Sequence, residues 1–160
     1  MLGAQEIRQL AQKLEIRPTK KLGQNFVIDP NTIRKIISAS QITKEDLVVE
    51  IGPGLGSLTL GILEVCPRVI AVEIDERLAK ELPETIKRHA PDATLDLVVS
   101  DALKTKELPG SPTARVANLP YNISVPVLLH FLEQFPSINK GLVMVQAEVA
   151  HRLAAGPGSK

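Results

Sequence analysis

The 160-residue chain is poor in cysteine and in aromatic residues, and its other shortages also exclude classes of protein. A single cysteine, Cys66, excludes an internal disulfide and any zinc site built on several cysteines. No apolar run reaches the roughly 18 residues of a membrane span, and the amino terminus has neither the basic start nor the apolar core of a signal peptide. A net charge of +1 is not the basic excess that nucleic-acid binders usually show. The composition therefore predicts a cytoplasmic globular protein without a membrane partner.

The few aromatic residues are placed unusually. Tryptophan is absent, and the four aromatic residues are Phe26, Tyr121, Phe131 and Phe135. Phe26 and Tyr121 lie in polar segments that contain glycine, proline or asparagine, where neither a core strand nor a core helix is expected. Aromatic rings in such segments are candidates for stacking on a flat ligand.

From residue 47 onward, short apolar runs alternate with helical patterns. The apolar runs cover 47–51, 69–73, 95–99, 114–117 and 141–145, and the helical patterns cover 58–65, 76–89, 124–135 and 148–154. Nearly continuous Val, Ile and Leu in the strands indicate burial on both faces, which is typical of a parallel sheet covered by helices. Right-handed crossovers between successive strands then predict an α/β, doubly wound, Rossmann-like sheet. Pro83 is expected to kink or shorten its helix.

The first 46 residues follow a different pattern. An amphipathic helix is predicted over 4–14, a basic loop over 17–26, and a second helix from Asp29-Pro30, with Asp29 as N-cap. We therefore divide the chain into an N-terminal region, 1–46, and a core, 47–160. Five strands followed by the flexible tail 156–160 are expected of a sheet cut short, the alternative being a small natural domain with a frayed end.

The first predicted strand runs into a glycine-rich turn, Gly52-Pro53-Gly54-Leu55-Gly56. Ligands of open parallel sheets bind beyond the carboxyl ends of the strands, and glycines there permit a sharp turn and close approach to a ligand. The spacing is G-x-G-x-G, not the G-x-G-x-x-G of dinucleotide enzymes, and Pro53 removes one N–H. Both features argue against an NAD-dependent dehydrogenase. The turn is therefore either a nucleoside site or only a tight turn.

Acidic residues end the next two strands. Glu73 follows Gly52 by 21 positions, a spacing at which a carboxylate can accept hydrogen bonds from both hydroxyls of a ribose. Asp75 competes for that role, although we expect it to cap the next helix. Asp101 ends the third strand, where it can accept from the amine of an adenine or cap a helix.

The fourth strand ends in Asn118-Leu119-Pro120-Tyr121, which combines two hydrogen-bond acceptors and an aromatic ring. The side-chain oxygen of Asn118 and the backbone carbonyl of Leu119 can accept both N–H bonds of an adenine amine and favour a tetrahedral nitrogen. Tyr121 can stack on a base turned out of its helix. A plain proline turn is the structural alternative.

Together, these motifs resemble the ribosomal RNA adenine dimethyltransferase family, and within it the bacterial small-subunit branch. The resemblance covers residues 16–160 and rests on ordered matches at 22–26, 49–59, Glu73, 100–102, 118–121 and 145–153. It implies a Rossmann-like methyltransferase domain of seven strands followed by a small helical domain. The chain would then be a truncated methyltransferase fold of about five parallel strands with helices on both faces, without the C-terminal helical domain and weak or inactive alone.

The resemblance also implies the chemistry. S-adenosylmethionine would be the cofactor, no metal would take part, and methyl groups would pass to the N6 amines of two adjacent adenosines in small-subunit (16S) rRNA. The partner would be the pre-30S particle, and the reaction would support ribosome maturation. In-line displacement at the sulfonium methyl leaves positioning of the amine as the main contribution to catalysis.

Site residues are implied in three groups. The catalytic group is Asn118, Leu119, Pro120 and Tyr121. The cofactor-binding group is Asn25 and Val27 in an entry loop, Gly52, Gly54, Glu73, Ile74, Asp101, Ala102 and Asn118. The RNA-contacting group is Lys20, Lys21, Phe26 and Tyr121.

Two alternatives within this resemblance stay open. The first is a large-subunit methyltransferase of the macrolide-resistance type, against which Leu119 and the segment 146–153 argue. The second is a non-catalytic RNA-binding assembly factor, which the intact Asn118, Pro120 and Tyr121 disfavour.

Overall fold

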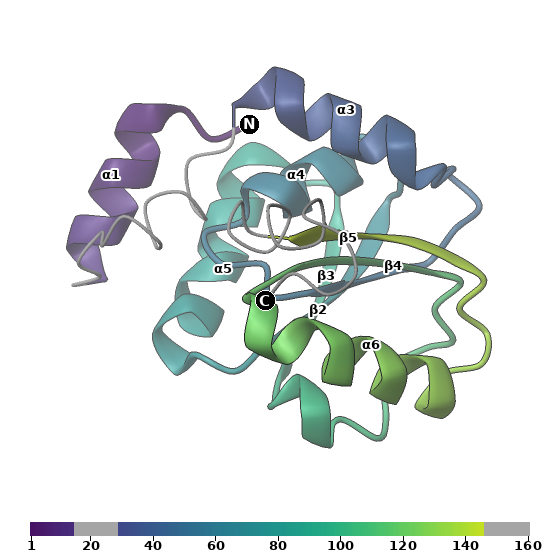
Figure 1. Cartoon of the computed structure of the whole chain (residues 1–160). Helices are drawn as coiled ribbons and strands as arrows, with labels where there is room; N and C mark the ends of the chain where they lie inside the picture. The colour runs from purple at the N-terminus through teal and green to yellow at the C-terminus, as the bar shows by residue number, and fades with distance from the viewer. Residues whose placement is uncertain (15–28, 146–160) are drawn as a thin grey trace, which may run out of the picture.

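The computed structural model describes residues 1–14 and 29–145 (Figure 1). Its elements are α1 (Ala4–Lys13), α3 (Pro30–Ser40), β1 (Val48–Ile51), α4 (Ser57–Leu63), β2 (Arg68–Glu73), α5 (Glu76–His89), β3 (Thr94–Val99), the 3₁₀ turn η1 (Ala102–Lys104), β4 (Ala114–Leu119), α6 (Tyr121–Gln134) and β5 (Lys140–Val145). The predicted helix 148–154 and the whole predicted basic loop 17–26 lie outside the described residues. None of the described helices is long and apolar enough to cross a membrane.

The strands form one parallel sheet in the order β3-β2-β1-β4-β5, which confirms the predicted α/β architecture. The chain moves outward from β1 to β3, then returns to the other side of β1 for β4 and β5. Because such crossovers are right-handed, this reversal puts α4 and α5 on one face and α6 on the other, as Figure 1 shows. In sheets of this architecture, ligands bind beyond the carboxyl ends of the strands at such a reversal, which here lies between β1 and β4.

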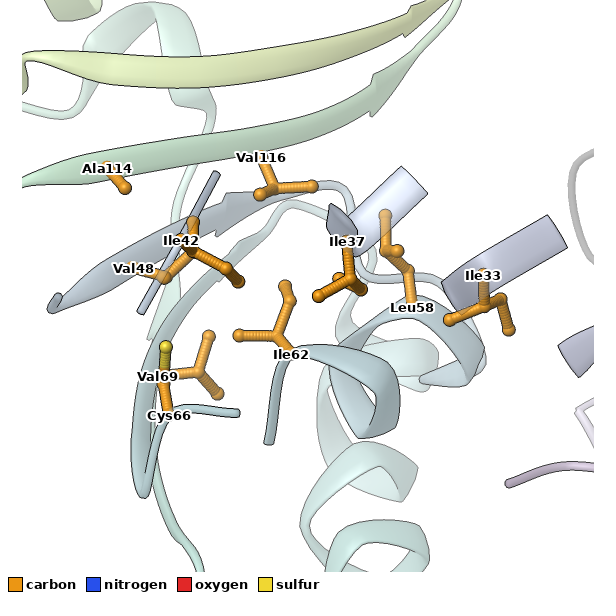
Figure 2. Close-up of a cluster of buried hydrophobic side chains, with 10 residues drawn as sticks. All are labelled: Ile33, Ile37, Ile42, Val48, Leu58, Ile62, Cys66, Val69, Ala114 and Val116. Carbon is orange, nitrogen blue, oxygen red and sulfur yellow. The ribbon is translucent and has the colours of Figure 1, made fainter. Parts of the chain in front are cut away.

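Apolar side chains from α3, α4 and three strands fill one face of the sheet. Figure 2 shows this cluster, which consists of Ile33, Ile37, Ile42, Val48, Leu58, Ile62, Cys66, Val69, Ala114 and Val116. Helices α3 and α4 approach closely at Gly61, where an added Cβ would lie 2.3 Å from Ile33 Cγ2. Any larger residue there would have to push α3 away, so this glycine sets the helix spacing.

Helix α6 closes the opposite face. Val127 and Phe131 are buried against Val49, Ile51 and Ile70 of the sheet. The outer flank of the same helix exposes the large apolar side chains Val125, Leu129 and Leu132. A third apolar cluster joins α1 to α5 through Leu2, Ile7, Leu10, Leu78, Leu82 and Ile86.

The predicted helix caps are confirmed, but of the two effects predicted for Pro83, a kink or a shortened helix, the shortening is wrong. Asp29 caps α3 by accepting from Thr32 N–H at 3.0 Å, and Asp75 caps α5 by accepting from Arg77 N–H at 2.9 Å. Helix α5 continues through Pro83 to His89 without shortening. Burial of Leu82 and Ile86 beside it holds the helix against its neighbours, and this outweighs the single hydrogen bond that proline removes.

The boundary between β4 and α6 also differs from the prediction. The strand extends two residues further than expected, to Leu119, because its backbone pairs with β5 as far as Leu119 and Val145. Helix α6 begins three residues earlier than expected, at Tyr121, and the Pro120 carbonyl accepts from Ser124 N–H at 3.1 Å in its first turn. Only Pro120 therefore separates the strand from the helix.

Candidate functional site

Three of the predicted site residues lie on one rung at the carboxyl edge of the sheet. Ile51 pairs with Val72 on β2 and with Ala117 on β4, so the residues that follow, Gly52, Glu73 and Asn118, emerge at the same level. Gly52 has φ +74°, and a Cβ added to it would lie 2.9 Å from the backbone oxygen of Asn118. This contact brings the first and fourth strand ends together, as the sequence predicted.

The Glu73 carboxylate connects the second strand end to the glycine-rich turn. Its Oε1 accepts from Gly54 N–H at 3.3 Å, and its Oε2 accepts from Asp75 N–H at 3.0 Å. The Glu73 backbone oxygen accepts from Ser100 N–H at 3.0 Å, which brings the third strand end alongside. Gly54, Glu73, Asp101 and Asn118 are thus gathered at one edge of the sheet and not spread over the molecule.

Glu73 is 6% exposed. Burial raises the pKa of its carboxyl above the ordinary value, and hydrogen bonds from the backbone of Asp75, Gly54 and Ile74 offset only part of that rise. Each carboxylate oxygen has a second lone pair and can accept a further hydrogen bond. The group can therefore accept hydrogen bonds from the two hydroxyls of a diol. Beside it, the Ile74 side chain is 64% exposed, which leaves an apolar surface free for a flat ring.

At the third strand end, Asp101 caps a helical turn, which was one of its two predicted roles. Its side chain accepts from Leu103 N–H at 2.9 Å and so caps η1. Ala102 packs at the margin of the apolar cluster beneath α6. Asp101 is half-buried, and its part in holding an adenine stays a prediction.

At the fourth strand end, the motif forms the last step of β4 and the start of α6. Asn118 is half-buried and pairs with Met144, and Leu119 is buried and pairs with Val145. Pro120 is exposed with φ −59°, and Tyr121 is the first residue of α6. Their catalytic roles stay predictions, as does base stacking by the Tyr121 ring. The other predicted residues, Lys20, Lys21, Asn25, Phe26 and Val27, lie outside the described residues.

One further acid at this edge received no role from the sequence. Glu50 is 1% exposed, and Thr59 of α4 donates a hydrogen bond to its Oε1. The pKa of Glu50 is raised to about 8: burial is the largest cause, the hydrogen bond from Thr59 opposes it, and the charge of Glu73 adds to the rise. The available signal was an acid within the otherwise apolar run 48–51, because a carboxyl group is rarely fully buried without a partner.

Across residues 1–14 and 29–145, no three acid, histidine or cysteine side chains come together as a metal-binding group.

Comparisons with known proteins agree with one another on the family. The family described as ribosomal RNA adenine dimethylase matches residues 16–160. A relative from Corynebacterium glutamicum (strain R), named ribosomal RNA small subunit methyltransferase A, is 63% identical over 164 residues, which cover 100% of this chain and 56% of that protein. The chain thus spans about half the length of such curated relatives.

Two solved structures are similar at 32% identity, each with a TM-score of 0.67. One is a dimethyladenosine transferase from Plasmodium falciparum, where the match covers 80% of this chain and 46% of the other. The other is the 23S rRNA methyltransferase ErmE, where it covers 82% and 52%. A family match over nine-tenths of the residues, a relative at 63% identity and the shared fold lead to one conclusion: the chain belongs to the ribosomal RNA adenine dimethylase family.

Proposed function

We propose that this chain is the cofactor-binding part of an S-adenosylmethionine-dependent enzyme that dimethylates the N6 amines of two adjacent adenosines in small-subunit rRNA. The observation that carries the proposal is the meeting of Gly52, Gly54, Glu73 and Asn118 at the carboxyl edge of the sheet. The small-subunit substrate is favoured over the large-subunit one because the relative at 63% identity is named for the small subunit, whereas ErmE is 32% identical.

The residues present fit an adenosyl cofactor. In the Gly52–Gly54 turn, the backbone would approach the methionine end of the cofactor closely. Gly52 has no side chain to intervene, and a side chain there would meet Asn118. Glu73 would accept from the ribose hydroxyls, Ile74 would pack on the adenine face, and Asp101 with Ala102 would hold the adenine edge. When bound, S-adenosylmethionine would supply a methyl group on a sulfonium, which needs no acid to leave.

The fourth strand end would position the target amine. Asn118 Oδ1 and the Leu119 carbonyl would accept its two N–H bonds, which localises the nitrogen lone pair and directs it along the line of transfer. Pro120 would hold that carbonyl in place, and Tyr121 would stack on the base. Positioning of this kind contributes to rate by converting a bimolecular encounter into an intramolecular step.

The substrate contacts extend beyond this edge. We propose that Asn25 and Val27 close over the cofactor and that Lys20, Lys21 and Phe26 contact RNA. The division into an N-terminal region, 1–46, and a methyltransferase core, 47–160, stays part of the proposal. So do a helical domain in the full-length protein, a pre-30S particle as partner and action in the cytoplasm.

Two measurements test the proposal. Titration of the chain with S-adenosylmethionine and with NAD, side by side, is expected to give binding of S-adenosylmethionine alone. The full-length protein that carries this sequence is expected to methylate small-subunit particles and not large-subunit particles. Equal affinity for NAD would overturn the cofactor assignment. Particle binding without methyl transfer would favour the non-catalytic assembly factor.

A further inference from the structure

Glu50 is a fully buried carboxyl group that lies two residues before Gly52. It occupies the third position of β1, where Ala71 of β2 and Val116 of β4 pair with it. Thr59, itself 0% exposed, donates to Oε1, while Oε2 has no hydrogen-bond partner among the described residues. A carboxylate in this position would be removed from bulk solvent with one oxygen unpaired among the described residues, which is costly for the charged form.

The groups packed around Glu50 do not compensate a negative charge. On β2, Glu73 contributes a second acid. From β4, Arg115 pairs with Val49 and therefore points to the opposite face of the sheet. The α4 contribution is the neutral Thr59, and α3 adds apolar side chains to the same face. Within the described ranges, Glu73 is thus the charged group that acts on Glu50, and it repels the ionised form.

Resting on the proposed function, we propose that Glu50 carries a proton before the cofactor binds and releases it when S-adenosylmethionine binds. The O–H bond of the acid breaks, the proton passes to the solvent buffer, and the carboxylate that remains becomes a counter-charge to the cofactor. Glu50 would therefore help the pocket to distinguish a cationic cofactor from its neutral-sulfur product.

The two ligands differ by one charge. S-adenosylmethionine carries a sulfonium, an ammonium and a carboxylate, whereas S-adenosylhomocysteine lacks the sulfonium and is neutral overall. A positive charge beside two acids favours ionisation of the one that is still protonated, and in a water-poor site that effect is strong. Loss of the methyl group removes the positive charge, so Glu50 takes its proton back and the product is held less tightly.

Titration calorimetry of the chain at pH 7 in two buffers of different ionisation enthalpy, phosphate and Tris, counts the protons released. With a pKa of about 8, Glu50 is roughly nine-tenths protonated at that pH. We expect S-adenosylmethionine to release about half a proton or more, and S-adenosylhomocysteine to release clearly less. Glu50→Gln keeps an acceptor for Thr59 but cannot ionise, so the difference between the two ligands should vanish.

A pH series gives the second readout. The preference of the wild-type chain for S-adenosylmethionine over S-adenosylhomocysteine should rise between pH 6 and pH 8, by up to about tenfold per pH unit for one linked proton, and should stay flat in Glu50→Gln. Both ligands carry the same α-amino group, and its contribution to the pH dependence is measured in Glu50→Gln. Thr59→Val should retain the release, because the acid is still present.

The outcomes separate this inference from the proposed function. Failure to bind S-adenosylmethionine at all would contradict the function. Binding with equal proton release for both ligands, or with none, would overturn the role of Glu50 alone. Because both ligands are compared on the wild-type chain, these outcomes can be told apart even if Glu50→Gln does not fold.

Discussion

The most deeply buried acids at the two edges of the sheet differ in their partners. At the amino edge, Asp46 accepts from Thr113 Oγ1 at 2.7 Å and pairs with Lys140 at 3.0 Å, and Arg68 pairs with Asp96. At the carboxyl edge, neither Glu50 nor Glu73 forms an ion pair with a described cation, although both are more than nine-tenths buried. The ion pairs of the amino edge stabilise the fold. The acids of the carboxyl edge lack such pairs, which lowers stability but leaves them available to a ligand.

The same contrast appears in the pKa values. Burial would raise the pKa of Asp46, but hydrogen bonds from Thr113, from the Thr43 N–H and from Lys140 outweigh it and lower the pKa. Burial dominates for Glu50 and Glu73, whose pKa values are raised. Asp46 therefore stabilises the fold at pH values above its ordinary value of 3.8. Glu50 contributes most below 4.5 and loses that contribution as the pH rises toward about 8.

The largest expected effect lies at the carboxyl edge. Asn118→Ala in the full-length protein should lower the rate of methyl transfer by roughly 100- to 1,000-fold, as loss of one positioned hydrogen-bond partner does in other active sites. Cofactor affinity should fall much less. Methyl incorporation into small-subunit particles and calorimetry measure the two effects. Asn122→Ala, which changes an exposed residue in the first turn of α6, is the matched control. Unchanged turnover in Asn118→Ala would remove this residue from the mechanism.

The next effect concerns cofactor affinity. Glu73→Ala should weaken S-adenosylmethionine binding by about tenfold to a hundredfold, because hydrogen bonds to a charged group contribute about 1.5–3 kcal/mol. Stability at pH 7 should not fall in proportion, since an unpaired buried carboxyl is itself unfavourable. Calorimetry together with urea unfolding separates the two quantities. Equal affinities for the variant and the wild type would show that Glu73 does not hold the ribose.

The sequence could predict those residues of the carboxyl edge whose positions follow from local pattern and strand order. Glu73 and Asn118 end apolar strands, and the register of a parallel sheet then brings them to one rung, so local pattern and topology were sufficient. Glu50 lies inside a strand. The apolar run around it indicates a buried position, but its partner Thr59 comes from α4, and that contact depends on tertiary packing. The early start of α6 and the continuity of α5 through Pro83 likewise result from tertiary packing.

At the amino edge, substitution of Asp46 should change the stability of the fold and its pH dependence, and not cofactor binding. Asp46→Asn should lower the free energy of unfolding at pH 7 by about 1–3 kcal/mol, because it weakens bonds to a charged group that is 7% exposed. At pH 3 the Asp46 carboxyl of the unfolded chain, with its ordinary pKa of 3.8, is largely protonated, so keeping it ionised in the folded state costs free energy and the difference should shrink. Urea unfolding at the two pH values measures this. Asp92→Asn, at an exposed carboxylate, is the control, and an equal loss at both pH values would contradict the assigned cause.

The smallest effect comes from two glycines with positive φ, one near each edge. At Gly110, with φ +142°, an added Cβ would lie 3.0 Å from Leu47 Cδ2, a side-chain atom that can shift. Gly110→Ala should therefore lower stability by about 1 kcal/mol and leave cofactor affinity unchanged. At Gly52 the neighbour is the Asn118 backbone oxygen, which cannot move without displacing β4. Gly52→Ala should thus weaken S-adenosylmethionine binding by about tenfold, roughly 1.4 kcal/mol. It should also destabilise the fold. If calorimetry showed that the two substitutions affect cofactor binding equally, the separation of the two edges into stabilising and ligand-binding parts would fail.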